Sequence, residues 1–122
     1  MFGNRSIIDS FKHSFEGVSH AFFENRNMRI HVSVGAIVLM AGLILNVSKF
    51  EMIIIAVMII LVIMMEMINT AIEEMVDLIV TEHHKQAKIA KDVASGMVLV
   101  AVIGSVIAGA FIFLPHVLKL LG

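Results

Sequence analysis

An unbroken apolar run, Met52–Met65, leads directly into a line of polar side chains. Glu66, Asn69, Glu73 and Asp77 follow at spacings of three or four residues, so they fall within about 80° of one helix face. A carboxylate this far inside an apolar segment is energetically costly, and acids within membrane helices are candidate functional residues. We therefore expect the function of this chain at the point where the helix leaves a membrane.

The composition indicates a membrane protein. The 122 residues are 59% hydrophobic, above the roughly 45–50% of soluble domains. Three segments approach the roughly 20 apolar residues that a spanning helix needs. The sequence therefore predicts one all-α membrane domain over residues 1–122, with spans at about 30–48, 52–72 and 96–114. The second helix is expected to continue outside the membrane to about residue 80, and the third to end at Pro115.

Charge and cysteine content exclude several classes of site and partner. The net charge of −1 creates no general field that would attract nucleic acid. The chain has no Cys, which excludes disulfides and thiolate metal sites. Lys and Arg are concentrated before the first predicted span and in the 81–95 loop, which by the positive-inside rule places both in the cytoplasm. These residues are Arg5, Lys12, Arg26, Arg29, Lys85, Lys88 and Lys91, against Lys49 and Lys119 on the opposite side.

The segment before the first span predicts an amphipathic helix on the membrane surface, over about residues 5–24. Its apolar side chains recur every three to four residues, and most polar ones lie away from that stripe. The stripe consists of Ile7, Ile8, Phe11, Phe15, Val18 and Phe22. In the third span, Ala101, Ser105 and Gly109 form a ridge of small residues suited to close helix packing. Three helices make a thin bundle for a deep polar site, so we expect oligomerisation.

The line of acids suggests two separate roles. Glu73, near water, is suited to hold a hard cation, because Mg²⁺ is commonly bound by one or two carboxylates together with substrate phosphates. Glu66 lies about 10 Å further along the axis, at a depth that suits a general base for a buried alcohol. Asn69 is placed to orient either carboxylate, whereas Glu74 lies off the line and is expected to be structural.

The 81–95 loop is the second polar cluster. Its adjacent residues His83 and His84 do not converge easily on Zn²⁺, so a solvated basic loop or a polyphosphate contact is the better interpretation. Lys91 and Asp92 precede the third span, and a helix start favours anions. The sequence has no Walker A loop and no GxGxxG motif. Spacing alone leaves open an enzyme, a small cation- or proton-coupled transporter and a non-catalytic scaffold.

One pattern is more specific. The segment 66–77, with the form E-x-x-N-T-A-I-E-x-x-x-D, and the later Lys91-Asp92 closely resemble the prokaryotic diacylglycerol kinase and undecaprenol kinase family. The resemblance extends to Phe15-Glu16-Gly17 and covers nearly the whole chain. Residues 26–31 and 113–115 look more like the undecaprenol kinase branch.

The resemblance implies a homotrimer of three-span subunits in the bacterial cytoplasmic membrane, with sites shared between neighbours. It also implies transfer of the ATP γ-phosphoryl, with Mg²⁺, to a lipid alcohol. The favoured alcohol is undecaprenol, giving undecaprenyl phosphate, and the alternative is diacylglycerol, giving phosphatidic acid. By motif match, Glu66 would be the base, supported by Asn69, and Glu73 a metal ligand. The expected nucleotide contacts are His13 (stacked on adenine), Glu73, Asp77, Glu82, His84, Lys91 and Asp92, and the expected lipid contacts are Glu66, Ser95, Arg29 and His31.

One position departs from the family. A metal-binding Glu usually stands four residues before the arginine that matches Arg29, where this chain has Asn25. Glu24 lies one step earlier. We expect either Asn25 or Glu24 to be the second metal ligand, and an amide oxygen would bring no charge to the ion.

Overall fold

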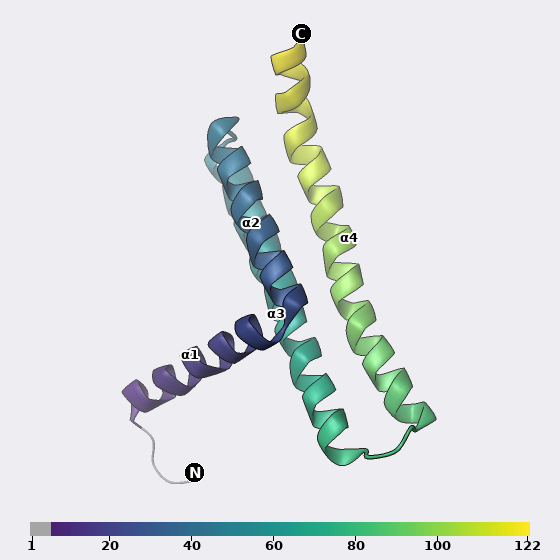
Figure 1. Cartoon of the computed structure of the whole chain (residues 1–122). Helices are drawn as coiled ribbons and strands as arrows, with labels where there is room; N and C mark the ends of the chain where they lie inside the picture. The colour runs from purple at the N-terminus through teal and green to yellow at the C-terminus, as the bar shows by residue number, and fades with distance from the viewer. Residues whose placement is uncertain (1–5) are drawn as a thin grey trace.

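The computed structural model describes residues 6–122, which form four helices and no strand (Figure 1). Three of the helices are long and apolar enough to cross a membrane. The all-α prediction with three candidate spans is confirmed, while residue 5, where the predicted surface helix begins, lies outside the described residues. The helices are α1 (Ile7–Glu24), α2 (Arg26–Ile44), α3 (Lys49–Ile79) and α4 (Lys85–Leu121).

A single residue separates α1 from α2, the first candidate span. Asn25 has an extended backbone (φ −117°, ψ 111°), its N–H donates to Ala21 at the end of α1, and its side chain caps the start of α2. Nη1 of Arg29 donates to the carbonyls of Phe22 and Phe23 at 3.1 and 2.8 Å, which satisfies the last turn of α1. The chain therefore bends here, and α1 projects away from the bundle (Figure 1).

The turn between α2 and α3 is short and well capped. Asn46 takes a left-handed conformation (φ 57°), which Asn tolerates better than most residues. Ser48 and Glu51 form a reciprocal capping box at the start of α3. No Gly or Pro interrupts α3, so at 1.5 Å per residue it extends for about 46 Å, longer than the roughly 30 Å hydrocarbon layer.

Close approach of α2 to α3 depends on two glycines. A Cβ added at Gly35 would lie 2.8 Å from Cγ2 of Ile59, and one added at Gly42 would lie 2.9 Å from Cε of Met52. Both glycines are buried. Small residues at such contacts let membrane helices pack backbone to backbone.

The helix α4 continues beyond the point where the sequence predicted its end. Pro115 lies inside it, and the helix runs on to Leu121. Proline removes one backbone hydrogen bond. In an apolar environment, unwinding the helix would leave more backbone groups without partners, so the helix continues. His116 Nε2 also contacts Oε1 of Glu51 at 3.1 Å, which ties the segment beyond Pro115 to the first turn of α3. Where the membrane span itself ends stays a prediction.

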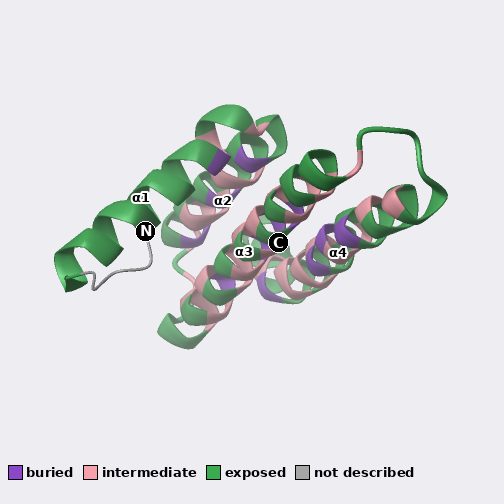
Figure 2. Cartoon of the chain, turned by 90° about the horizontal axis from the view of Figure 1, so that it is seen from below, coloured by how far each residue is buried: buried purple, intermediate pink, exposed green. Residues whose placement is uncertain are grey.

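The buried positions lie where α2, α3 and α4 face one another, whereas their outer sides are exposed (Figure 2). On α4 the buried stripe includes Ala94, Val98 and Ala101, so part of the predicted small-residue ridge is used in packing within the chain. On α1 only Ala21 is buried, and Phe11 and Phe15 of its apolar stripe are exposed. The core of the described chain is therefore thin, and most apolar surface is left for lipid or neighbouring chains.

Candidate functional site

The carboxylate of Glu66 is the most buried polar group of the described chain, with 1% of the residue exposed. Nδ2 of Asn25 donates to its Oε1 at 2.9 Å, and Nε2 of His31 lies 3.6 Å from its Oε2. Thr70 stands one turn further along α3, where its hydroxyl donates to the Glu66 carbonyl and accepts from Asn25. The start of α2 thus supplies the polar surroundings of an acid in the middle of α3.

Asn69 and Glu73 form the next step of the acid line. Nδ2 of Asn69 donates to Oε1 of Glu73 at 3.2 Å, so Asn69 orients Glu73 and not Glu66. The side-chain oxygen of Asn69 is buried and has no hydrogen-bond partner among the described residues. Buried polar atoms nearly always have a partner, so an unpaired acceptor beside a carboxylate indicates a place for a donor or a cation.

The exposed end of the acid line, at Asp77, pairs with the start of α4. Nζ of Lys91 lies 2.5 Å from Oδ1 of Asp77, and both side chains are partly exposed. One turn away, Lys88 and Asp92 pair within α4 at 2.6 Å. The structure therefore brings together Glu73, Asp77 and Lys91 on the same side of the bundle. These three residues, which carry charges of both signs, form the rim of the site.

A contact between His20 and Glu74 joins α1 to α3. Nε2 of His20 lies 2.7 Å from Oε1 of Glu74, and both side chains are more than half exposed. The hydrogen bond to Glu74, and then the charge of that carboxylate, raise the pKa of His20 above its ordinary 6.5. Glu74 thus has a helix-to-helix role, as its place off the acid line predicts.

The remaining predicted site residues are spread around this centre. His13 is exposed and lies 3.6 Å from Glu16 within α1. His84 caps α4 through Nδ1, and Glu82 and Ser95 are exposed. Arg29 is engaged with the α1 carbonyls, so its guanidinium holds the junction in this conformation.

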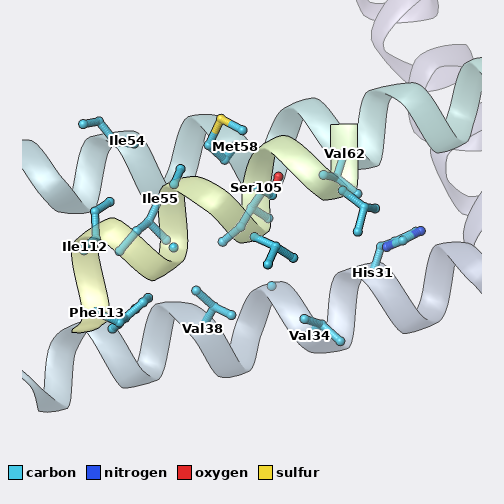
Figure 3. Close-up of a pocket in the computed structure, with 16 residues that line it drawn as sticks. His31, Val34, Val38, Ile54, Ile55, Met58, Val62, Ser105, Ile112 and Phe113 are labelled. Atoms are coloured by element: carbon cyan, nitrogen blue, oxygen red, sulfur yellow. The ribbon is translucent and has the colours of Figure 1, made fainter. Parts of the chain in front are cut away.

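An apolar cavity of about 240 Å³ lies between α2, α3 and α4 (Figure 3). His31 stands at one end beside Val34 and Val62, while Ile112 and Phe113 line the other end. Because His31 also lies next to Glu66, one end of the cavity adjoins the buried carboxylate.

The residues present fit a hard divalent cation that is held mainly by its substrate. Among residues 6–122, no three His, Asp or Glu side chains converge as they would in a site built by protein alone. Mg²⁺ needs only one or two carboxylates when phosphates and waters complete its shell. Glu73 supplies one such carboxylate, and the neighbouring Asn69 adds a buried oxygen that has no hydrogen-bond partner among the described residues.

Two of these contacts could not be predicted from the sequence. Thr70 was visible in the motif, yet its bond to Asn25 depends on how the start of α2 meets α3. The contact of His20 with Glu74 joins residues 54 positions apart on two helices. The site as a whole offers a buried carboxylate at an apolar cavity and a partly exposed rim with charges of both signs. This arrangement can serve a reaction between a membrane-embedded partner and a charged, water-soluble one.

Comparison with known proteins supplies the chemistry. Residues 12–113 match the family described as prokaryotic diacylglycerol kinase. The sequence is 41% identical over 117 residues to a diacylglycerol kinase of Synechocystis sp., across 95% of this chain and 67% of that protein. It is 41% identical over 109 residues to the undecaprenol kinase of Bacillus subtilis, across 89% of each. It is 32% identical over 117 residues to the diacylglycerol kinase of Escherichia coli K12, across 93% of each.

Proposed function

Because this chain belongs to the prokaryotic diacylglycerol kinase family, and is therefore a multi-pass membrane lipid kinase that uses ATP, we propose that it phosphorylates undecaprenol at the cytoplasmic face of the bacterial cell membrane. The observation that carries the proposal is the buried Glu66 carboxylate, placed between an apolar cavity and a charged rim. A lipid alcohol reaches this position from the membrane, and ATP reaches the rim from water.

Glu66 is proposed as the general base. The lipid hydroxyl oxygen attacks the γ-phosphorus of ATP, the bond to the β-phosphate oxygen breaks, and ADP leaves. The hydroxyl proton passes to a Glu66 oxygen. The carboxylate is held by Asn25 on one side and faces His31 on the other, so one of its oxygens remains available for the proton. Phosphoryl transfer asks mainly for such positioning and for neutralisation of charge.

The nucleotide is assigned to the rim. Lys91 is proposed to leave Asp77 for the phosphates, with Glu82, His84 and Asp92 nearby, and His13 is proposed to stack on adenine. Glu73 and the side-chain oxygen of Asn69 would hold Mg²⁺, which when bound neutralises charge on the phosphates. Of the two residues predicted as a second ligand, Glu24 is exposed and the Asn25 side chain is already bonded at both ends. Ser95 and His31 are proposed to contact the lipid.

Undecaprenol is preferred because residues 26–31 and 113–115 resemble the undecaprenol kinase branch. Overall identity does not separate the two substrates, since a diacylglycerol kinase and an undecaprenol kinase are both 41% identical to this chain. Diacylglycerol is therefore the second candidate. The exposed apolar faces of α3 and α4 support assembly into the homotrimer that the family resemblance implies.

Parallel assays test the proposal. Purified protein in micelles is given ATP with a labelled γ-phosphoryl and either undecaprenol or diacylglycerol, and labelled lipid is measured. We expect undecaprenol to give the higher kcat/KM. A higher kcat/KM for diacylglycerol would reverse the substrate assignment, and labelling of neither lipid would contradict the proposed reaction.

A further inference from the structure

The side chain of Asn25 is bonded at both of its polar ends. Its amide nitrogen donates to Oε1 of Glu66 at 2.9 Å and to Oγ1 of Thr70 at 2.5 Å. Its oxygen accepts from the backbone N–H of Asn27 at 2.9 Å, which caps the start of α2. Asn25 therefore joins the first turn of α2 to the acid line of α3.

These contacts determine which way the amide points. A backbone N–H can only donate, so the Asn27 N–H requires the oxygen of the Asn25 amide, and the NH₂ group is thereby directed to Glu66 and Thr70. Rotation by 180° would set oxygen against the Glu66 carboxylate and NH₂ against the Asn27 N–H. The only atom of the Asn25 side chain that can ligate a hard cation is thus directed to the first turn of α2, where it accepts the helix-cap hydrogen bond.

The bond from Asn25 also matters for Glu66 because the carboxylate has few other partners. His31 lies 3.6 Å from Oε2, beyond a normal hydrogen bond, and the side-chain amide of Asn69 is directed to Glu73. Among residues 6–122, Asn25 is the one side chain that donates a hydrogen bond to this carboxylate. Loss of a donor to a buried carboxylate leaves that group both underpaired and free to rotate.

We infer that Asn25 is a positioning residue, which holds the Glu66 carboxylate in place by donating a hydrogen bond, and that it is not a metal ligand. The inference rests on the proposed role of Glu66 as the base. At Asn25, this chain departs from its family, and the side chain at this position would orient the base. Glu73 remains the carboxylate that faces the metal.

The substitution Asn25→Asp separates the two roles. Asp caps helices as well as Asn does and has nearly the same shape, so the start of α2 is kept. At Glu66, however, a donor becomes a second acid. If Asn25 positions the base, kcat falls by roughly tenfold to a hundredfold, while the KM for ATP and the Mg²⁺ concentration for half-maximal rate stay unchanged. If Asn25 is a metal ligand, the added charge instead lowers the Mg²⁺ requirement, and that result would overturn the inference.

Two further variants control for charge and for folding. Asn27→Asp adds the same charge two residues away on an exposed side chain and should leave kcat and the Mg²⁺ curve as in the parent protein. Thr70→Val removes the hydroxyl that anchors the Asn25 amide while keeping its volume, and should lower kcat in the same direction as Asn25→Asp, but less. Equal kcat for Thr70→Val and the parent would count against a bond network that runs through Asn25.

A readout independent of activity completes the test. In detergent, Asn25→Asp should lower the unfolding temperature of the parent protein. It should lower it much less in a Glu66→Gln background, because the Gln amide can donate to the new carboxylate. Equal losses in the two backgrounds would show that the two side chains do not interact and would overturn the inference. Full kinase activity of Glu66→Gln alone would instead remove the proposed base, while the thermal comparison would still report the contact.

Discussion

At the scale of single residues, the acid line divides into a buried part and a more exposed part. Glu66 is enclosed, and its neighbours come from α2, whereas Glu73 is half-buried and is oriented by Asn69. Lys91 stands at the rim, held by Asp77. In the proposed mechanism, this separation along one helix would let one face of α3 serve both the lipid hydroxyl and the nucleotide.

Glu73 and Lys91 should respond differently to Mg²⁺. Glu73→Gln is expected to weaken metal–nucleotide binding, and raised Mg²⁺ should recover part of the lost rate. Lys91→Ala is expected to have a lower rate that added Mg²⁺ does not restore, because the Lys91 ammonium group is proposed to bind the phosphates directly. Activity measured across a Mg²⁺ series checks both, with Lys88→Ala as the matched control for loss of a nearby lysine. Identical Mg²⁺ responses of the two variants would refute this division.

The sequence predicted much of this arrangement, and the exceptions have physical causes. The face shared by Glu66, Asn69 and Glu73 follows from helical spacing within one element, so the order along the line could be derived. The amide of Asn25 could not be placed in this way. Its partners lie 41 and 45 residues away, and its oxygen is taken up by a helix cap that forms only where α1 ends.

At the scale of helices, position depends on a few close contacts. The packing of α2 on α3 needs the missing side chains of Gly35 and Gly42. The attachment of α1 uses the bend at Asn25 and the contact of His20 with Glu74. The helices themselves were predictable from apolar length. The continuation of α4 past Pro115 was not, because it depends on contacts such as that of His116 with α3.

Gly35→Ala should loosen the α2–α3 contact. The added Cβ would lie 2.8 Å from Cγ2 of Ile59, so overpacking should cost about 1–3 kcal/mol of unfolding free energy. Gly17→Ala on α1 is the matched control, since nothing lies within 4 Å of its added Cβ, and it should be neutral or stabilising by about 0.5–1 kcal/mol. Thermal unfolding in detergent compares the two. Equal stability of both variants would argue against the close approach at Gly35.

The attachment of α1 should weaken as pH rises. Glu74 raises the pKa of His20 above 6.5, so the stabilisation from this contact is fully present below pH 6.5. It is lost as pH rises through the raised folded-state value. The stability difference between the parent and His20→Gln should therefore shrink towards alkaline pH. His13→Gln controls for loss of a histidine, because His13 pairs with Glu16 within the same helix. A difference independent of pH would exclude this contribution.

At the scale of the whole molecule, one chain leaves most of its apolar surface uncovered. Large side chains such as Ile53, Val57 and Ile60 of α3 are more than half exposed. In a bilayer such surface faces lipid or another subunit. The contacts of one chain place Glu66, Glu73 and Lys91 on one side of the bundle, and the proposed homotrimer would bring further surfaces to that side.

A trimer with shared sites makes a specific prediction. Light scattering in detergent should give a protein mass three times the 13.4 kDa of one chain. Co-assembly of Glu66→Gln subunits with Lys91→Ala subunits should recover part of the activity that each variant lacks alone, because some sites would then receive both native residues. No recovery in verified mixed trimers would indicate sites completed within each chain.

The central claim is that Glu66 accepts the proton of a lipid alcohol during transfer from ATP. Its most direct test measures labelled γ-phosphoryl transfer from ATP to undecaprenol by the parent protein and by Glu66→Gln, with ATP affinity measured alongside. We predict that Glu66→Gln lowers kcat by roughly a hundredfold to ten thousandfold, as expected for loss of a general base, while ATP affinity is kept. Comparable kcat for the two proteins would contradict the claim.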